Sequence, residues 1–328
     1  MKKPLVIFLT LLIGCKIFIA SAFFLISYGT KVGDDKSHIV IIPPHTSIQK
    51  MAQILKHDEV ISTEITFKLW TYLLSRFSPL KAGEYEFHPP HRLKDIIAKM
   101  QQGETVVRRF TVVEGTTSAD IIKRLEALPF LHGDCAIPEE GTLLPETYHF
   151  SYGEKRCDLI KRMQKSFQKE AKKLWQARSL TLPYQTLQEA VILASLVEKE
   201  TAIPEERPRI AAVFLNRLRV GMPLQCDATV LYGLYREQGL ALNRHLSKAE
   251  LKKPTPYNTY LNKGLPPSPI CNPGIASLKA VLAPLDTKDL YFVANGEGGH
   301  EFSETYGKHF EHHKAWRKLR KKVVSTLP

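Results

Sequence analysis

The apolar pattern of residues 187–201 predicts a buried helix that ends in two glutamates. Thr186 and Glu189 match a capping box, in which the two side chains bind backbone amides reciprocally, so the helix should begin directly after the threonine. Residues three, four and seven apart share one helix face, so Glu200 extends an apolar stripe. That stripe consists of Leu193, Leu196 and Val197. Glu198 falls on a smaller and more polar flank.

A carboxyl at the end of an apolar stripe has unusual acid–base chemistry. Burial removes its hydration, which raises its pKa towards neutrality. Such a group stays protonated at pH 7 and can deliver a proton. Glu200 is therefore a candidate acid. The structural alternative is an ion pair between Glu200 and Arg207 or Arg217 at the helix end.

The first third of the chain repeats a strand, a tight turn and a helix three times. The copies begin at Ile39, Glu84 and Phe110, and each changes from period two to period 3.6 across its turn. Thr46 or Ser47 should cap the first helix and Ser118 the third. These units resemble LysM-type glycan-binding modules, which predicts a small LysM-like α+β domain over residues 36–130. A purely structural spacer is the alternative.

Longer helices dominate the remainder. A loop-rich joint at residues 141–155 precedes a basic amphipathic helix at 155–180, and a strand at 289–295 and a basic helix at 312–322 follow. The pattern predicts a larger, helix-rich mixed domain over residues 140–328. The fold class is therefore α+β.

Residues Leu5–Gly29 form an apolar segment interrupted only by Lys16, long enough to cross a bilayer. Two lysines precede it, so residues 1–31 are interpreted as a cytoplasmic tip and a transmembrane anchor. The chain would be a single-pass protein of the inner (plasma) membrane with its folded part on the outer, periplasmic side. A signal peptide cleaved near Ala22 and a lipoprotein box at Cys15 are the alternatives.

Charge and cysteines fit this location. The formal charge of +13 indicates an anionic partner, yet an external domain meets no nucleic acid, and the lysines do not interleave with aromatic residues. Four cysteines outside the apolar segment allow three pairings in an oxidising compartment. If a bridge forms, Cys135 with Cys157 closes the shortest loop, whereas Cys226 and Cys271 lie farther on. Four free thiols are equally compatible with the sequence.

Four blocks of the second half occur in a characteristic order. They read "LASLVEKET", "VFLNRLRVGMPLQCDATVLYG", "PYNTYLNKGLPPSPICNPG" and "LYFVANGEGGHEFSETYGKH". Together they resemble the signature blocks of the MltG (YceG-like) family, whose members are membrane-anchored endolytic murein transglycosylases. The strong resemblance covers residues 141–313 and extends to the anchor and the LysM-like region by architecture.

The resemblance implies a lytic transglycosylase. Such an enzyme cleaves the β-1,4 bond between N-acetylmuramic acid and N-acetylglucosamine within nascent glycan strands, leaves 1,6-anhydro ends without using water, and so terminates elongation. One glutamate suffices, and the match to "EKET" assigns it to Glu200. Family blocks place the substrate-binding candidates Gln225, Asp227, Tyr257, Asn258 and Tyr260 on loops. Glu198, Asn216 and Arg217 are expected to support the site.

Two departures from the family pattern affect the site. Where the family reads Gln-Ser/Thr-Asp-Pro-Thr, this chain has Cys226 and Ala228, and Cys271 also replaces a residue of another type. Two other functions remain open: a membrane-anchored glycan-binding scaffold without catalysis, and a hydrolytic muramidase with Asp227 or Glu198 as the second carboxylate.

No metal or cofactor is expected. His300 and Glu301 begin a pattern that lacks the second histidine of a zinc protease. In the cluster His309, His312 and His313, no acidic or cysteine partner completes a credible metal site. The expected partners are peptidoglycan glycan strands, the membrane and peptidoglycan synthases.

Overall fold

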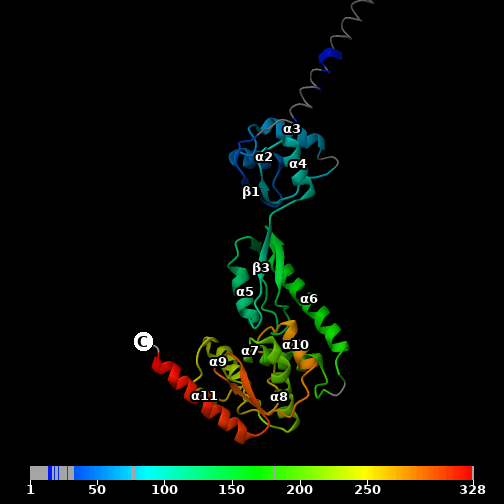
Figure 1. Ribbon diagram of the computed structural model, residues 1–328. Coiled ribbons are helices and arrows are strands. Elements are labelled where there is room, and N and C mark those ends of the chain that lie inside the picture. Colours follow the sequence, from blue (N-terminus) through cyan, green and yellow to red (C-terminus); the bar gives the residue numbers. More distant parts are fainter. Residues whose placement is uncertain are drawn as a thin grey trace, which may run out of the picture. The chain divides into compact units, whose positions relative to one another are not determined.

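The computed structural model describes residues 14–16, 18, 21, 28, 33–74, 78–179 and 182–326 (Figure 1). The fold is mixed α+β and rich in helices, which confirms the predicted class. Within these ranges, no helix combines the length and the apolar character needed to cross a bilayer. The predicted anchor Leu5–Gly29 falls almost entirely outside them.

Two compact units make up the chain. The first comprises Met1–Arg109, Pro129–His132 and His149–Lys155, and the second comprises Phe110–Leu128, Gly133–Tyr148 and Arg156–Pro328. The domain boundaries predicted from the sequence stay a prediction.

The first unit contains the first two predicted repeats. Strand β1 (His38–Ile42) pairs antiparallel with β2 (Gly83–Phe87), and Val40 lies opposite Tyr85. Helices α2 (Ile48–His57), α3 (Glu64–Leu74) and α4 (Leu93–Gln102) pack with these strands around one apolar core. Ser47 is the cap of α2, because its hydroxyl accepts a hydrogen bond from Lys50 N at 3.3 Å. Two short strands, β4 (Leu131–His132) and β6 (Glu154–Lys155), pair in parallel.

The third repeat also forms. Strand β3 (Val107–Thr111) pairs with β5 (Thr147–Ser151), and α5 (Ser118–Glu126) follows the turn. The cap predicted at Ser118 is wrong by one residue. Thr117 has the extended backbone of a cap and accepts from Asp120 N at 3.2 Å, whereas Ser118 is already helical.

The second unit is built mainly from helices (Figure 1). They are α6 (Arg156–Gln176), α7 (Leu187–Glu200), α8 (Arg207–Arg219), α9 (Asp227–Gln238), α10 (Ile275–Leu282) and α11 (Tyr306–Thr326). Short 3-10 turns occupy Pro204–Glu206 and Glu250–Lys252. The predicted capping box of α7 is confirmed, and α7, α8 and α10 share the largest core. The strand predicted at 289–295 is β7 (Tyr291–Ala294), which pairs antiparallel with β8 (His300–Ser303).

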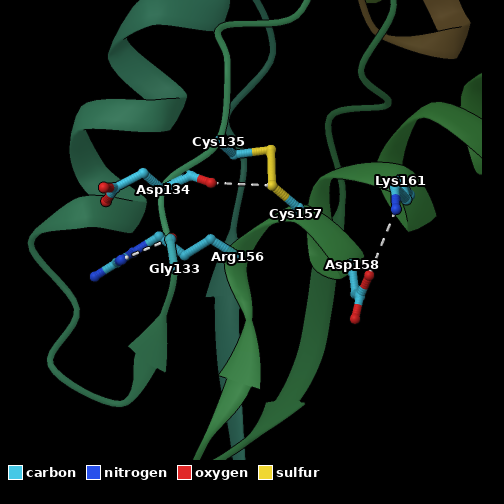
Figure 2. Close-up of a disulfide and its surroundings, with 7 residues drawn as sticks. All are labelled: Gly133, Asp134, Cys135, Arg156, Cys157, Asp158 and Lys161. Atoms are coloured by element: carbon cyan, nitrogen blue, oxygen red, sulfur yellow. Dashed lines mark hydrogen bonds and ion pairs between the residues drawn. A yellow bond between two sulfur atoms is a disulfide. The ribbon is translucent and has the colours of Figure 1, made fainter.

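A disulfide joins Cys135 to Cys157, so of the possible pairings the short loop is the one that forms (Figure 2). Their Cα atoms lie 5.4 Å apart, and the adjacent Arg156 donates to the carbonyl of Gly133 at 3.0 Å. Cys226 and Cys271 are buried free thiols.

Candidate active site

Glu200 is the last residue of α7, at the point where the buried face of the helix ends. Its carboxyl has a raised pKa, mainly because burial removes its hydration and secondarily because Asp227 is negatively charged. The Cys226 thiol forms a hydrogen bond with the carboxyl and opposes this rise, as do the charges of His300 and Arg217. A raised pKa is what the predicted role of proton donor requires.

The Glu200 side chain lines a cavity of about 430 Å³ in the second unit. Of the predicted residues, Gln225, Asp227, Tyr260 and Arg217 line it too. They come from the C-terminal half of α8, the start of α9 and the loop around residue 260, which folding brings to the end of α7.

The segment before α9 is held by Thr259. The amide of Gln225 donates to the Thr259 carbonyl at 3.1 Å, and the amide of Cys226 donates to the Thr259 hydroxyl at 3.0 Å. These bonds hold Gln225 at a φ of 52°, a left-handed conformation that costs a non-glycine residue on the order of 1–3 kcal/mol. Strained backbone of this kind concentrates at functional sites, because the surrounding contacts must maintain it.

Asp227 and Tyr260 form a pair at the wall of this cavity. The Tyr260 hydroxyl donates to Asp227 Oδ1 at 2.6 Å. Burial, followed by the hydrogen bond to Asp227, raises the pKa of Tyr260, so its hydroxyl stays protonated and donating. Within the described part of the chain, no hydrogen bond occupies the other Asp227 oxygen, which leaves it for a ligand in the cavity.

Arg217 faces the cavity from α8 with its guanidinium anchored to backbone. Its Nε donates to the Leu290 carbonyl at 2.7 Å and its Nη1 to the Leu224 carbonyl at 2.6 Å. The side chain is therefore a fixed positive charge near Glu200. Its neighbour Asn216 serves another contact, because its amide donates to the carbonyls of Thr287 and Asp289 at 2.8 and 3.0 Å. Asn216 joins α8 to the segment before β7.

Glu198 has a structural environment that differs from that of Glu200. Its side chain is 5% exposed, and it lies 3.3 Å from Arg207 Nη2 and accepts from Gly274 N at 2.8 Å. A Cβ at position 274 would meet the Glu114 carboxylate, so a side chain there would push the flexible Glu114 side chain aside. Arg207 Nη2 also lies 3.4 Å from the Glu114 carboxylate. Arg207, which the sequence offered as an ion-pair partner of Glu200, therefore pairs with Glu198 and Glu114.

Tyr257 and Asn258 are not among the cavity-lining residues. Asn258 is fully buried, and its amide donates to the carbonyls of Leu251 and Lys253 at 2.9 and 2.8 Å. The Tyr257 hydroxyl lies 2.7 Å from Ser268 Oγ. Both side chains stabilise the loop that carries Tyr260, which is the common role of asparagine in a turn.

The sequence reasoning missed the aromatic wall of the cavity. It consists of Tyr291 and Phe292 from β7 and Tyr306, His309 and His313 from α11, and the aliphatic Val293 of β7 lines the cavity beside them. The rings of Tyr291 and His309 are stacked with centroids 5.1 Å apart. A signal was present, because positions 306, 309 and 313 share one helix face. Burial, then nearby His313, Arg217 and His312, lowers the pKa of His309, so this imidazole is neutral and available for stacking.

Among the described residues, the group whose ligand atoms lie close enough to hold a metal is Asp34, His38 and His91 in the first unit. Asp34 Oδ1 lies 2.6 Å from His38 Nε2, and His91 Nε2 lies 2.6 Å from the Lys36 carbonyl. Two ligands of one zinc ion, each about 2.0–2.1 Å from the metal, stand farther apart than this. The contacts are those of a hydrogen-bonded network.

A protonatable carboxyl in a cavity with an aromatic wall is typical of enzymes that cleave glycosidic bonds. The comparisons with known proteins narrow this class. The model of the YceG-like family matches residues 40–315, and the chain belongs to this family. Its recognition from the four sequence blocks is thus confirmed.

Relatives include proteins named endolytic murein transglycosylase. The protein of Bacillus subtilis (strain 168) is 30% identical over 89% of this chain and 87% of its own length. That of Streptococcus pneumoniae (strain D39) is 27% identical over 80% of this chain, which spans about half (55%) of the streptococcal protein. The crystal structure of a yceG-like protein from Listeria monocytogenes matches with a TM-score of 0.55 at 30% identity, covering 85% of this chain and 99% of that one.

Proposed function

We propose that this protein is an endolytic peptidoglycan transglycosylase with Glu200 as its catalytic acid and base. The observation that carries the proposal is the raised pKa of Glu200 at the wall of an aromatic-lined cavity. The name and identity of the Bacillus subtilis relative support the same reaction class. A glycan strand running through this cavity is cut between N-acetylmuramic acid and N-acetylglucosamine.

In the first half of the reaction, protonated Glu200 donates its proton to the glycosidic oxygen, and the bond from C1 of the muramic residue to that oxygen breaks. The carboxylate then takes the proton of the C6 hydroxyl of the same sugar, and O6 bonds to C1. The product carries a 1,6-anhydro ring, no water is consumed, and Glu200 ends protonated again. A single carboxyl completes this cycle because the sugar supplies its own nucleophile.

The other cavity residues bind and orient the strand. Gln225 and the free oxygen of Asp227 offer polar groups to sugar hydroxyls and amides, and Tyr260 fixes the direction of the Asp227 carboxylate. Tyr291, Tyr306 and His309 offer ring faces against which sugar rings can pack. The positive charge of Arg217 stabilises the ionised form of Glu200, which accepts the C6 proton in the second half of the reaction.

The location proposed for this activity is the outer side of the inner (plasma) membrane. The apolar segment Leu5–Gly29 serves as a single-pass anchor with the N-terminus in the cytoplasm. The disulfide Cys135–Cys157 supports an oxidising compartment. The first unit serves as a LysM-like glycan-binding module, and peptidoglycan synthases supply the nascent strands.

The test uses the full-length chain in detergent or vesicles with uncrosslinked glycan strands, and product masses are measured. Wild type should release products one water lighter than hydrolysis would give. Glu200→Gln should lower the rate by about 10²–10⁴-fold, the contribution of a general acid–base residue. Glu205→Gln, in the exposed turn after α7, is the matched control and should cleave like wild type. Cleavage by Glu200→Gln at the wild-type rate would contradict the assignment.

A hydrolytic muramidase is the second candidate, because Asp227 shares the cavity with Glu200 and could activate a water. That enzyme would leave reducing muramic ends, and the product mass separates the two reactions. If wild type binds strands in membranes supplied with active synthases and cuts none, the protein is a glycan-binding scaffold.

A further inference from the structure

Helix α3 (Glu64–Leu74) exposes apolar side chains on the face opposite to its buried one. Ile65 is 75% exposed, Leu69 50% and Leu73 41%, and Tyr72 between them is 63% exposed. These positions lie four, seven and eight residues after the first and so share one face. The buried face holds Phe67 and Trp70, which belong to the core of the first unit. Large apolar side chains gathered on one exposed face mark an interaction surface.

The contact of helix α3 with the end of the apolar segment indicates the partner of this face. Tyr28 stacks on Trp70 of α3, with ring centroids 4.1 Å apart and an interplanar angle of 28°. Tyr28 is the penultimate residue of Leu5–Gly29. Tyr28, at the outer end of the proposed anchor, is therefore held directly against α3.

We propose that α3 lies on the outer surface of the membrane with Ile65, Leu69, Tyr72 and Leu73 inserted at the boundary of headgroups and acyl chains. An amphipathic helix binds a bilayer in this way through its apolar face. Tyr72 is a residue type that favours the membrane interface. The inference rests on the membrane anchor of the proposed function and adds a second contact that orients the first unit.

Lipid fits this face better than the other available partners. Three of the four exposed side chains are aliphatic, and they offer a sugar neither a hydrogen bond nor an aromatic ring. The polar groups beside them are already engaged with one another, since Lys68 Nζ lies 3.6 Å from Glu64. A transmembrane helix of another protein is the remaining candidate partner. Vesicles of pure lipid contain no such helix, so binding of α3 to them identifies lipid as the partner.

The experiment places a tryptophan on this face in the full-length chain, reconstituted into phospholipid vesicles whose acyl chains carry bromine. Leu69→Trp is the reporter and Leu73→Trp a second one. Ile39→Trp is the control at another exposed apolar position of the first unit (60% exposed). The emission of wild type gives the background of the native tryptophans and is subtracted.

The added tryptophan at 69 or 73 should lose about half of its emission to bromine, because an interfacial helix buries its apolar face about 5–10 Å deep. The control at 39 should keep its emission. Equal emission with and without bromine at both reporters would overturn the proposal, as would equal quenching at 39. Flotation of wild type with the vesicles tests whether the segment Leu5–Gly29 anchors the protein, and strand cleavage tests the proposed enzymatic activity. The membrane anchor, the activity and the contact of α3 with lipid are therefore tested by separate measurements.

Discussion

Removal of the Tyr260 hydroxyl tests the geometry of the cavity most directly. In the variant Tyr260→Phe, Asp227 loses the hydrogen bond of 2.6 Å that fixes its carboxylate. Hydrogen bonds to charged groups contribute about 1.5–3 kcal/mol when solvent is excluded. Asp227 is exposed, so water screens and partly replaces this bond. About 1 kcal/mol is then lost from transition-state binding, which corresponds to a decrease of about fivefold in kcat/KM.

The assay measures the formation of anhydro ends on uncrosslinked strands as a function of strand concentration. Tyr257→Phe is the matched control, because it removes a hydroxyl of the same loop that contacts Ser268 outside the cavity. This control should change kcat/KM far less than Tyr260→Phe does, because every group that lines the cavity is kept. An equal loss of kcat/KM in the two variants would refute the conclusion that Tyr260 lies at the substrate and Tyr257 does not. A loss far above fivefold in Tyr260→Phe would mean that the hydroxyl contacts the reacting sugar itself.

Three further predictions concern titration and stability. Activity should fall as pH rises through the raised pKa of Glu200, because the acid then loses its proton. In Cys226→Ser a hydroxyl replaces the thiol and is the stronger hydrogen-bond donor to Glu200. This variant should therefore have a lower Glu200 pKa, and its pH–rate profile should fall at lower pH. Burial raises the pKa of Glu140 from 4.5 to about 7. The folded state therefore loses about 3 kcal/mol as pH rises from 4.5 to 7, and Glu140→Gln should flatten this dependence in denaturant titrations. Replacing Cys135 and Cys157 by serine should lower the free energy of unfolding by about 3 kcal/mol, measured by the same titration with wild type under reducing conditions as control.

Local patterns account for much of the fold. The capping box at Thr186 and Glu189 and the three strand–turn–helix repeats all form. Each depends on groups within one helix turn or one short loop, so neighbouring residues suffice to specify it. The error of one residue at the cap of α5 has the same origin, since Thr117 and Ser118 are equally good cap residues by type.

The aromatic wall of the site could not be found in this way. Tyr291 stands about ninety residues after Glu200 and Tyr306 farther still, and the pairing of β7 with β8 brings them to the cavity. Residue type leaves the role of Asn258 open, because a polar loop residue in a family block is equally suited to bind a sugar or a backbone carbonyl. Only its burial and its two carbonyl partners distinguish these roles.

The sequence by itself determined the family, the α+β class and the glutamate on which the proposed chemistry depends, because these follow from residue order and from helix periodicity. Tertiary structure decided which polar residues meet at Glu200, since this depends on contacts between segments far apart in the chain. It also decided that Arg207 pairs with Glu198 and Glu114. The charged partners of the two glutamates are a property of packing, because the groups that face Glu198 and Glu200 come from other segments and are not visible in one helix alone.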